Sequence, residues 1–281
     1  MTEQRIARLA AAALVEEVYT TPKPGLVDLN NTGAHGDMTV QTFLYSAAAL
    51  QPYFREMAAL GRALPMESLL PALREAGVRA EQAMFRATNG INTHKGALFS
   101  LGLLCGCAGR CMAEDLQPTA ERLCQMVATL TQGICTRELG HGEMTHGQGV
   151  YQKYGARGVR GEAEDGFPNV LQHSLPGFRA DLAQGGDYGE AAVKALLHLI
   201  AKVPDTTVLH RRGQDVAAWA AKEAESLLAQ YSEAAALALD DVFIRENISH
   251  GGCADLLAVT IFLHRVETEW TMDEPGETQR N

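Results

Sequence analysis

Apolar residues recur at intervals of three and four along most of the chain, which is the spacing of amphipathic helices. Near the N-terminus Ile6, Leu9 and Ala13 follow this spacing and Pro22 ends it, so a first helix is expected over about residues 3–19. Alternation with period two is nearly absent and β-branched residues rarely cluster, so the signals for strands are weak. The sequence therefore predicts an all-α fold.

Capping residues indicate where further helices begin. Thr39 is suited to cap a second helix, Pro65 to open a third, and Asn92 or Thr93 to cap a long apolar one. The other helices are expected over residues 118–137, 167–184, 189–202, 213–230, 232–246 and 252–268. Together these signals predict about ten helices joined by glycine-rich loops.

The composition favours one globular unit. The 281 residues are 46% hydrophobic and 21% charged, which is enough apolar sequence for a sizeable core. No internal repeat occurs, and no linker separates two compositions. We therefore expect a single compact catalytic domain over residues 1–270, followed by a polar C-terminal tail over residues 271–281.

Charge and hydropathy narrow the set of partners. The net charge of −10 and a pI of about 5.4 argue against binding to nucleic acid or to an anionic membrane surface. The longest uncharged run, between Lys95 and Arg110, is too short and too rich in glycine for a transmembrane span, so it predicts a buried helix. A signal peptide is not expected because Glu16 and Glu17 follow the N-terminal arginines closely. We expect a cytoplasmic protein that binds neither nucleic acid nor membrane.

The six cysteines fit that expectation. They lie mostly inside apolar helical sequence and do not form the regular framework of a small disulfide-bonded domain. Cys105, Cys107 and Cys111 resemble a metal cluster at first sight, but their spacing places only the last two on one face of a helix. Small buried core residues in a reducing compartment are the better interpretation.

The first candidate for chemistry is the loop over residues 21–38, which two prolines stiffen and three glycines open. Lys23 and His35 are suited to phosphate oxygens, and Asp28 and Asp37 could hold Mg²⁺. The alternative is a surface loop whose aspartates serve turns and helix starts.

The second candidate lies at the start of the apolar helix. Asn92, His94 and Lys95 stand where free backbone N–H groups and a partial positive charge favour phosphate. The alternative here is an ordinary capped helix whose Lys95 is solvated.

Three further polar segments repeat the pattern. Arg157 and Arg160 alternate with glycines before Glu162, and arginine forks suit phosphates while a nearby carboxylate suits a metal or a general base. Residues 204–213 carry aspartate and arginine, and residues 246–257 lead from a glycine pair into an acidic helix start. Each alone could be a loop with a capped helix. No P-loop or dinucleotide fingerprint occurs, which excludes both of those nucleotide-binding folds.

Two other site types are disfavoured. His141 and His146 flank Glu143, but the intervening glycines do not make the helical face of a zinc protease. The serines lack the sequence context of a nucleophile elbow. Neither a zinc site nor a serine hydrolase is therefore expected.

Taken together and in order, these segments resemble the triphosphoribosyl-dephospho-coenzyme A synthase family over nearly the whole chain. The resemblance rests on the order and spacing of the blocks PKPGLVD, GAHGDM, ATNGINTHKG, RGEAEDGFP, DTTVLHRRG and NISHGGCADLL. Thr207, His250 and Cys253 stand where the family is expected to carry asparagine, proline and serine. The resemblance therefore leaves open whether the citrate lyase or the malonate decarboxylase system is served, and whether the acceptor differs.

The resemblance implies a transfer in which ATP donates its triphosphoribosyl group to 3′-dephospho-CoA and releases adenine. It also implies Mg²⁺, and a downstream holo-synthase that attaches the product to a carrier protein. Under this hypothesis the catalytic residues are Glu162 and Asp205, and the metal ligands are Asp28, Asp37 and Asp255. The substrate-binding residues would be Lys23, His35, Asn92, His94, Lys95, Arg157, Arg160 and Arg211.

Two alternatives remain at this stage. A metal-dependent hydrolase of a nucleotide or an ADP-ribosyl group would use the same residue types, with water in place of the acceptor. A noncatalytic nucleotide-binding subunit would bind without turnover. The sequence also leaves a homodimer open.

Overall fold

The computed structural model describes residues 1–139 and 146–271. These residues form fourteen α-helices and one π-helical turn, and the described ranges contain no strand. The helices are α1 (Glu3–Tyr19), α2 (Val40–Ala63), α3 (Met66–Ala87), α4 (Lys95–Ala113), α5 (Ala120–Thr131), α6 (Ile134–Leu139), α7 (His146–Tyr154), α8 (Gly158–Glu164), η1 (Val170–Ser174), α9 (Leu175–Ala183), α10 (Tyr188–Lys202), α11 (Thr206–Arg212), α12 (Gln214–Ala229), α13 (Glu233–Arg245) and α14 (Gly251–Thr271). The predicted all-α class is confirmed.

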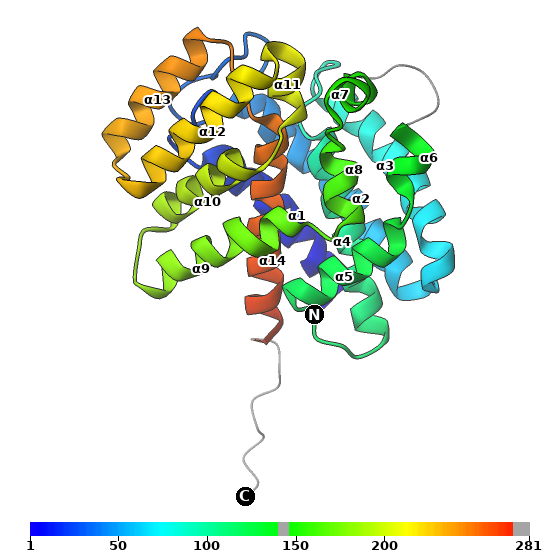
Figure 1. Cartoon of the computed structure of the whole chain (residues 1–281). Coiled ribbons are helices and arrows are strands. Elements are labelled where there is room, and N and C mark those ends of the chain that lie inside the picture. The colour runs from blue at the N-terminus through cyan, green and yellow to red at the C-terminus, as the bar shows by residue number, and fades with distance from the viewer. Residues whose placement is uncertain (140–145, 272–281) are drawn as a thin grey trace, which may run out of the picture.

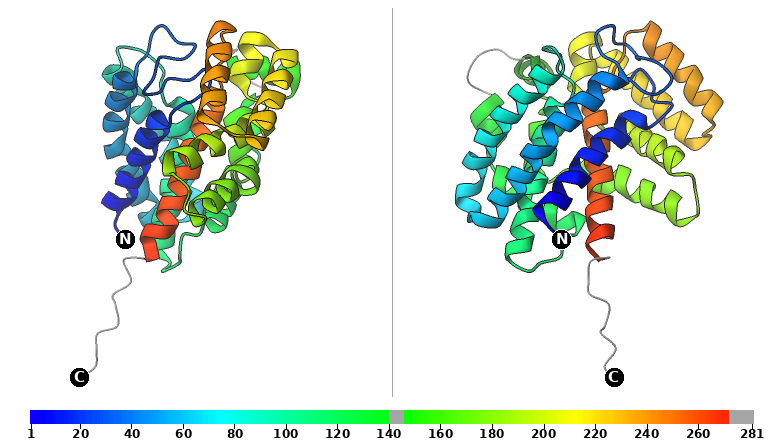
Figure 2. Two further views of the ribbon diagram at one scale, coloured as in Figure 1. Left: turned by 90° about the vertical axis from the view of Figure 1, so that its left-hand side faces the viewer. Right: turned by 180° about the vertical axis from the view of Figure 1, so that it is seen from behind.

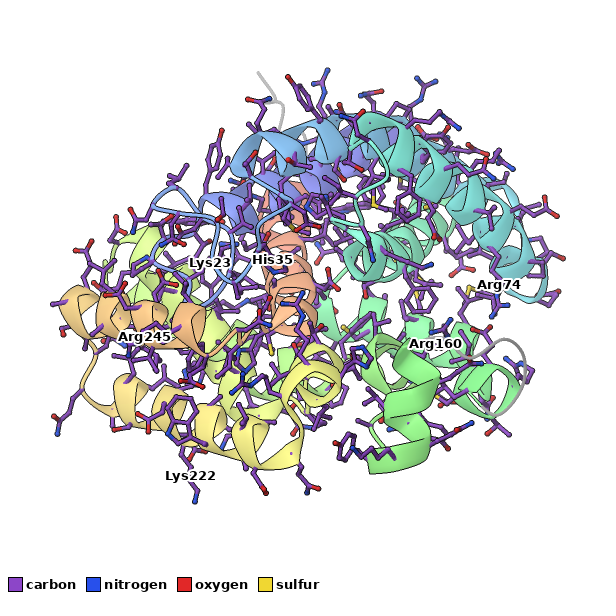
Figure 3. All side chains as sticks on the ribbon, turned by 90° about the horizontal axis from the view of Figure 1, so that it is seen from above. Lys23, His35, Arg74, Arg160, Lys222 and Arg245 are labelled. Carbon is purple, nitrogen blue, oxygen red and sulfur yellow. The ribbon has the colours of Figure 1, made fainter. Side chains whose placement is uncertain are left out.

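Helix α14 runs through the centre of the molecule (Figure 1). The N-terminal helices α2 to α4 pack on one side of it, and α9, α10, α12 and α13 lie on the other side. Seen from behind, α1 and α14 lie side by side (Figure 2), and these first and last helices of the described chain pack against each other. The loop after α1 and helix α11 lie at one end of the bundle, which Figure 3 views from above. One continuous core joins both sides.

Helix α4 is buried as its sequence predicted. It is the one helix among the described residues that is long and apolar enough to cross a membrane, and 72% of that window is buried inside the protein. Glycines let α2 approach it closely, because a Cβ atom on Gly61 would lie 1.8 Å from the Gly106 carbonyl oxygen. A Cβ atom on Gly109 would lie 1.9 Å from the carbonyl oxygen of Ala58. These glycines are therefore needed for close packing rather than for flexibility.

The helix number exceeds the expected ten because short helices were not foreseen. The segment 118–137 was predicted as one helix, but Gly133 has a φ of +76° and separates α5 from α6. Helices α7, α8 and α11 lie in glycine- and arginine-rich sequence without apolar periodicity, so the pattern gave no signal for them. The helix expected over 167–184 begins instead with the π-helical turn η1.

The structure tests the expectation for the cysteines but not those for two other segments. All six cysteines are free and buried, which confirms their assignment to the core. His141, Glu143 and residues 272–281 of the polar tail lie outside the described residues.

Candidate functional site

A cavity of about 1040 Å³ opens at the end of the bundle where the loop after α1 meets α3, α8, α11 and the starts of α4 and α14. Eight of the predicted site residues line it: Lys23, His35, Asn92, His94, Lys95, Arg160, Arg211 and Asp255. In the view from above, Lys23 and His35 lie together on one side, while Arg74 and Arg160 lie together on the other (Figure 3). Segments up to about 230 residues apart in the chain therefore contribute to one site.

The loop after α1 is held in shape by the carboxylate of Asp28. Its Oδ2 accepts the backbone N–H of Lys23 at 2.9 Å, and its Oδ1 accepts the N–H groups of Asn30 at 2.8 Å and Asn31 at 3.1 Å. Asp28 is 1% exposed and does not line the cavity. The carboxylate predicted to bind metal thus organises the loop that presents Lys23.

A second carboxylate fastens this loop to the C-terminal half. Asp240 of α13 accepts the N–H of Gly25 at 2.8 Å and the side-chain amide of Asn31 at 2.7 Å. From the same loop, His35 places its Nε2 2.8 Å from the hydroxyl of Ser249, just before α14. Burial, and then the charge of Arg211, lower the pKa of His35. These contacts fix the loop over the cavity.

Lys23 forms a buried ion pair that the sequence analysis missed. Its Nζ bonds to the carboxylate of Glu17 on α1, and the two residues are only 1% and 3% exposed. Burial raises the pKa of Glu17, while the charge of Lys23 lowers it. Both residues line the cavity. A signal existed, because Glu17 follows Leu14 by three positions on the apolar face of the first helix.

His94 occupies the N-cap position of α4 and is 2% exposed. Its Nδ1 lies 2.7 Å from the hydroxyl of Ser46, and its ring meets the edge of Phe43 at a centroid distance of 5.0 Å. Burial, reinforced by the charge of Lys23, lowers its pKa to about 3, so the imidazole is neutral at physiological pH. Its Nε2 is buried and has no hydrogen-bond partner among the described residues, which leaves one ring nitrogen available to a ligand.

Asp255 of α14 lies against the start of α4. A Cβ atom on Gly96 would lie 2.0 Å from its Oδ2, so any larger residue there would force the carboxyl group to move. Burial and then the nearby charge of Glu17 raise the pKa of Asp255, while a hydrogen bond from the backbone of Ala97 lowers it. Glu17, Glu81 and Glu138 in the lining are paired with cations, but no ion pair of Asp255 occurs within the described ranges. Its raised pKa favours the neutral acid, and a cation bound beside it would favour the carboxylate instead.

The cations at the other side of the cavity are already paired with carboxylates. Lys95 contacts Glu81 at 2.6 Å, and Arg160 contacts Glu138 at 2.7 Å. Arg157, predicted to bind substrate, does not line the cavity. It pairs instead with the acidic residues that end α8, Glu164 and Asp165.

The two predicted catalytic carboxylates lie outside the cavity lining. Asp205 caps α11 by accepting the N–H of Thr207 at 2.7 Å, and its other oxygen accepts the N–H of Cys253 at 2.9 Å. It thereby joins two segments that do line the cavity. Glu162 accepts the amide of Asn169 at 2.5 Å, and its second oxygen is buried without a partner. Their part in chemistry stays a prediction.

The three predicted metal ligands do not form a cluster. Within residues 1–139 and 146–271, no group of three or more His, Cys, Asp or Glu side chains is arranged to hold a metal ion. Asp37 is 64% exposed, with a weak contact of 3.9 Å to His35. Of the three, only Asp255 faces the cavity.

The three positions that depart from the family pattern gather near the start of α14. Thr207 lines the cavity. His250 is buried and lies beside Phe243, with ring centroids 5.3 Å apart, and Cys253 is fully buried. Only one of these departures can therefore touch a ligand in the cavity directly.

Comparison with known proteins gives concordant results. A family described as ATP:dephospho-CoA triphosphoribosyl transferase matches residues 3–274. A 2-(5″-triphosphoribosyl)-3′-dephosphocoenzyme-A synthase of Pectobacterium atrosepticum is 41% identical, over 95% of this chain and 89% of the relative. A relative from Citrobacter koseri assigned the same name is 44% identical, over 92% of this chain and 90% of its own.

A crystal structure from Archaeoglobus fulgidus, assigned as a triphosphoribosyl-dephospho-CoA synthase, has the same fold. The TM-score is 0.54 at 21% identity, and the match covers 80% of this chain and 98% of the other. At that identity the likeness concerns the fold alone.

Proposed function

The chain belongs to the ATP:dephospho-CoA triphosphoribosyl transferase family, and on that basis we propose that its cavity holds ATP and 3′-dephospho-CoA together. The reaction breaks the bond between adenine and C1 of the ATP ribose. The 2′-hydroxyl oxygen of dephospho-CoA forms the new bond to that carbon, its proton is released, and adenine takes up a proton. The triphosphate stays on the transferred ribose.

The observation that carries this proposal is the convergence of the predicted segments on one large cavity. Pockets for a single small ligand have volumes of about 300–1,000 Å³, and this one lies just above that range at about 1040 Å³. Its described lining holds five lysines and arginines beside four acidic residues, although the chain as a whole has a net charge of −10. Local cations of this kind offset the charge of two polyanionic substrates.

Mg²⁺ fits the cavity in the way that is usual for nucleotide enzymes. Mg²⁺ commonly binds through one or two protein carboxylates and several substrate phosphate oxygens, so a cluster of three protein ligands is not required. Asp255 lines the cavity and has no ion pair within the described part of the chain. Bound there, Mg²⁺ would neutralise charge on the triphosphate.

His94 is suited to the departing adenine. When Ser46 donates its hydroxyl hydrogen to Nδ1, the ring hydrogen lies on Nε2, and this N–H group can donate a hydrogen bond to a nitrogen of the base. Negative charge develops on adenine as its bond to ribose breaks, and a donor in a buried site stabilises that charge. Phe43 beside His94 offers the base an aromatic surface.

The product would serve as the prosthetic-group precursor of an acyl carrier protein, with citrate lyase and malonate decarboxylase both open. We also propose a cytoplasmic location, which the six unpaired cysteines support.

The test is to incubate the purified chain with Mg²⁺, ATP and dephospho-CoA, and to follow adenine by chromatography and the adduct by mass. Adenine release that requires the acceptor, with an adduct of the expected mass, supports the transferase. Release without acceptor would indicate a hydrolase. Saturable binding of ATP without turnover would indicate a binding subunit and contradict the proposal.

A further inference from the structure

Two arginines from different helices on the same side of the cavity share one carboxylate. Arg74 of α3 and Arg160 of α8 both bond to Glu138 of α6, one to each of its oxygens. Their side chains are 47% and 39% exposed, so the pair lies at the mouth of the cavity. In Figure 3 the two arginines face each other well away from Lys23 and His35.

Within the described residues, several arginines gather at this mouth. After burial, the charges of Arg137 and Arg160 are the factors that lower the pKa of Arg74. Arg137 and Arg160 are thus close enough to Arg74 to repel its charge, and Arg74 and Arg160 share the carboxylate of Glu138. Guanidinium forks bind phosphate oxygens in pairs, so the two arginines are suited to a diphosphate.

Apolar positions of α3 form a strip along the cavity on both sides of Arg74. Leu70, Leu73, Gly77 and Val78 line the cavity at helical spacing. Val78 is 58% exposed, and a Cβ atom built on Gly77 would meet no atom within 4 Å. The space beside this strip is therefore open and has an apolar wall, with room for a flexible, uncharged chain.

We propose that the Arg74–Glu138–Arg160 bridge and this α3 strip form the acceptor subsite, where the arginines hold the diphosphate of dephospho-CoA and its pantetheine arm runs along α3. The assignment rests on the proposed function. It follows that ATP takes the opposite end, where the triphosphate meets Lys23, His35 and Arg211.

The chemical difference between the two substrates favours this placement, with dephospho-CoA at the arginines and ATP at the opposite end. Dephospho-CoA carries a long arm on its diphosphate, and an exposed mouth with an apolar strip accommodates the arm without burying it completely. ATP has no such arm, and Lys23 at the opposite end is 1% exposed. Glu138 occupies the arginines in the absence of ligand, so the incoming diphosphate has to displace it from them.

The proposal predicts opposite effects for two substitutions. Arg74→Gln removes a charge-assisted hydrogen bond and should raise KM for dephospho-CoA about tenfold or more, while KM for ATP changes less than about twofold. Glu138→Gln removes the competing anion and should lower KM for dephospho-CoA. A purely structural role for the bridge would not tighten the binding of one substrate when Glu138 loses its charge.

Gly77→Leu tests the strip without endangering the fold. Leucine favours the helix over glycine, and its side chain enters open space, so the variant should fold normally and raise KM for dephospho-CoA alone. Glu75→Gln, at an exposed position of the same helix, is the matched control and should leave both constants unchanged.

Wild-type turnover of ATP and dephospho-CoA tests the proposed function. The subsite is tested separately, by whether the variants change KM for dephospho-CoA and not KM for ATP. Direct titration of each variant with dephospho-CoA in the absence of ATP checks that KM reports binding. Weaker binding of ATP in Arg74→Gln and Gly77→Leu, or an effect on neither substrate, would overturn the assignment even if the wild type is active.

Discussion

The neutral imidazole of His94 should make the fold sensitive to acid. Its pKa is about 3 in the folded protein, against about 6.5 for an exposed histidine, so below pH 6.5 the unfolded chain binds a proton that the folded chain excludes. Its contribution to stability is complete above pH 6.5 and is lost as the pH falls toward 3. At pH 4.5 the difference of about two pH units corresponds to about 3 kcal/mol, at about 1.4 kcal/mol per unit.

His94→Gln isolates this contribution, because glutamine can still meet Ser46 but does not titrate. Urea unfolding of wild type and variant at pH 7.5 and pH 4.5 gives four free energies, and effects of the carboxylates cancel between the two proteins. The wild type should lose about 3 kcal/mol more than the variant. His250, whose pKa burial lowers to about 4, should show a separate loss of similar sign when tested by His250→Gln. An equal loss in wild type and His94→Gln would refute the reasoning.

Three other predictions concern buried groups. Lys23→Met should lower the free energy of unfolding by about 3–5 kcal/mol because it leaves Glu17 buried and unpaired, and adding Glu17→Gln should recover most of the loss in urea denaturation; an undiminished loss would contradict it. Gly96→Ala should reduce kcat about tenfold or more in the adenine-release assay because its Cβ forces the Asp255 carboxylate to move, and an unchanged kcat would show that this carboxylate has no fixed role. The six cysteines should resist a thiol reagent in the native protein and all react after unfolding in guanidinium, whereas rapid labelling of the native chain would show that they are accessible.

Much of the fold could be predicted because long helices carry their signal locally. The apolar spacing in residues 3–19 and the uncharged run after Lys95 correspond to α1 and α4. Helices α8 and α11 could not be predicted in this way. They are seven residues each, and the capping and packing that stabilise them, such as the bond from Asp205 to α14, join positions far apart in the chain.

In the candidate site, too, the sequence could identify some residues and not others. Residue type and loop context found Lys23, His94 and Asp255, which the fold brings into one cavity. Sequence could not separate these from Asp28 and Asp205, because an aspartate that caps a turn and one that faces a ligand have the same local setting. The difference lies in where the carboxylate oxygens point, and backbone N–H groups already satisfy those of Asp28 and Asp205.

The sequence analysis also missed Arg74, Glu138 and Glu17, the first two for a related reason. In the sequence, Arg74 and Glu138 have the pattern of ordinary surface charges on helices. They line the cavity because α3 packs near α6 and α8. Glu17 was the exception, since a carboxylate on an apolar helix face is a warning of a buried partner.

The packing of α1 against α14 has a consequence for synthesis of the chain. Helices α1 to α4 pack mostly on one another and can associate as soon as they emerge from the ribosome. The cavity also needs Asp255 of α14, so it cannot be completed until nearly the whole chain has been made. Until then, the side of α1 that α14 covers has no partner. A nascent chain stalled before about residue 250 would be compact at its N-terminal end yet inactive, with an exposed apolar surface that invites chaperones and proteases.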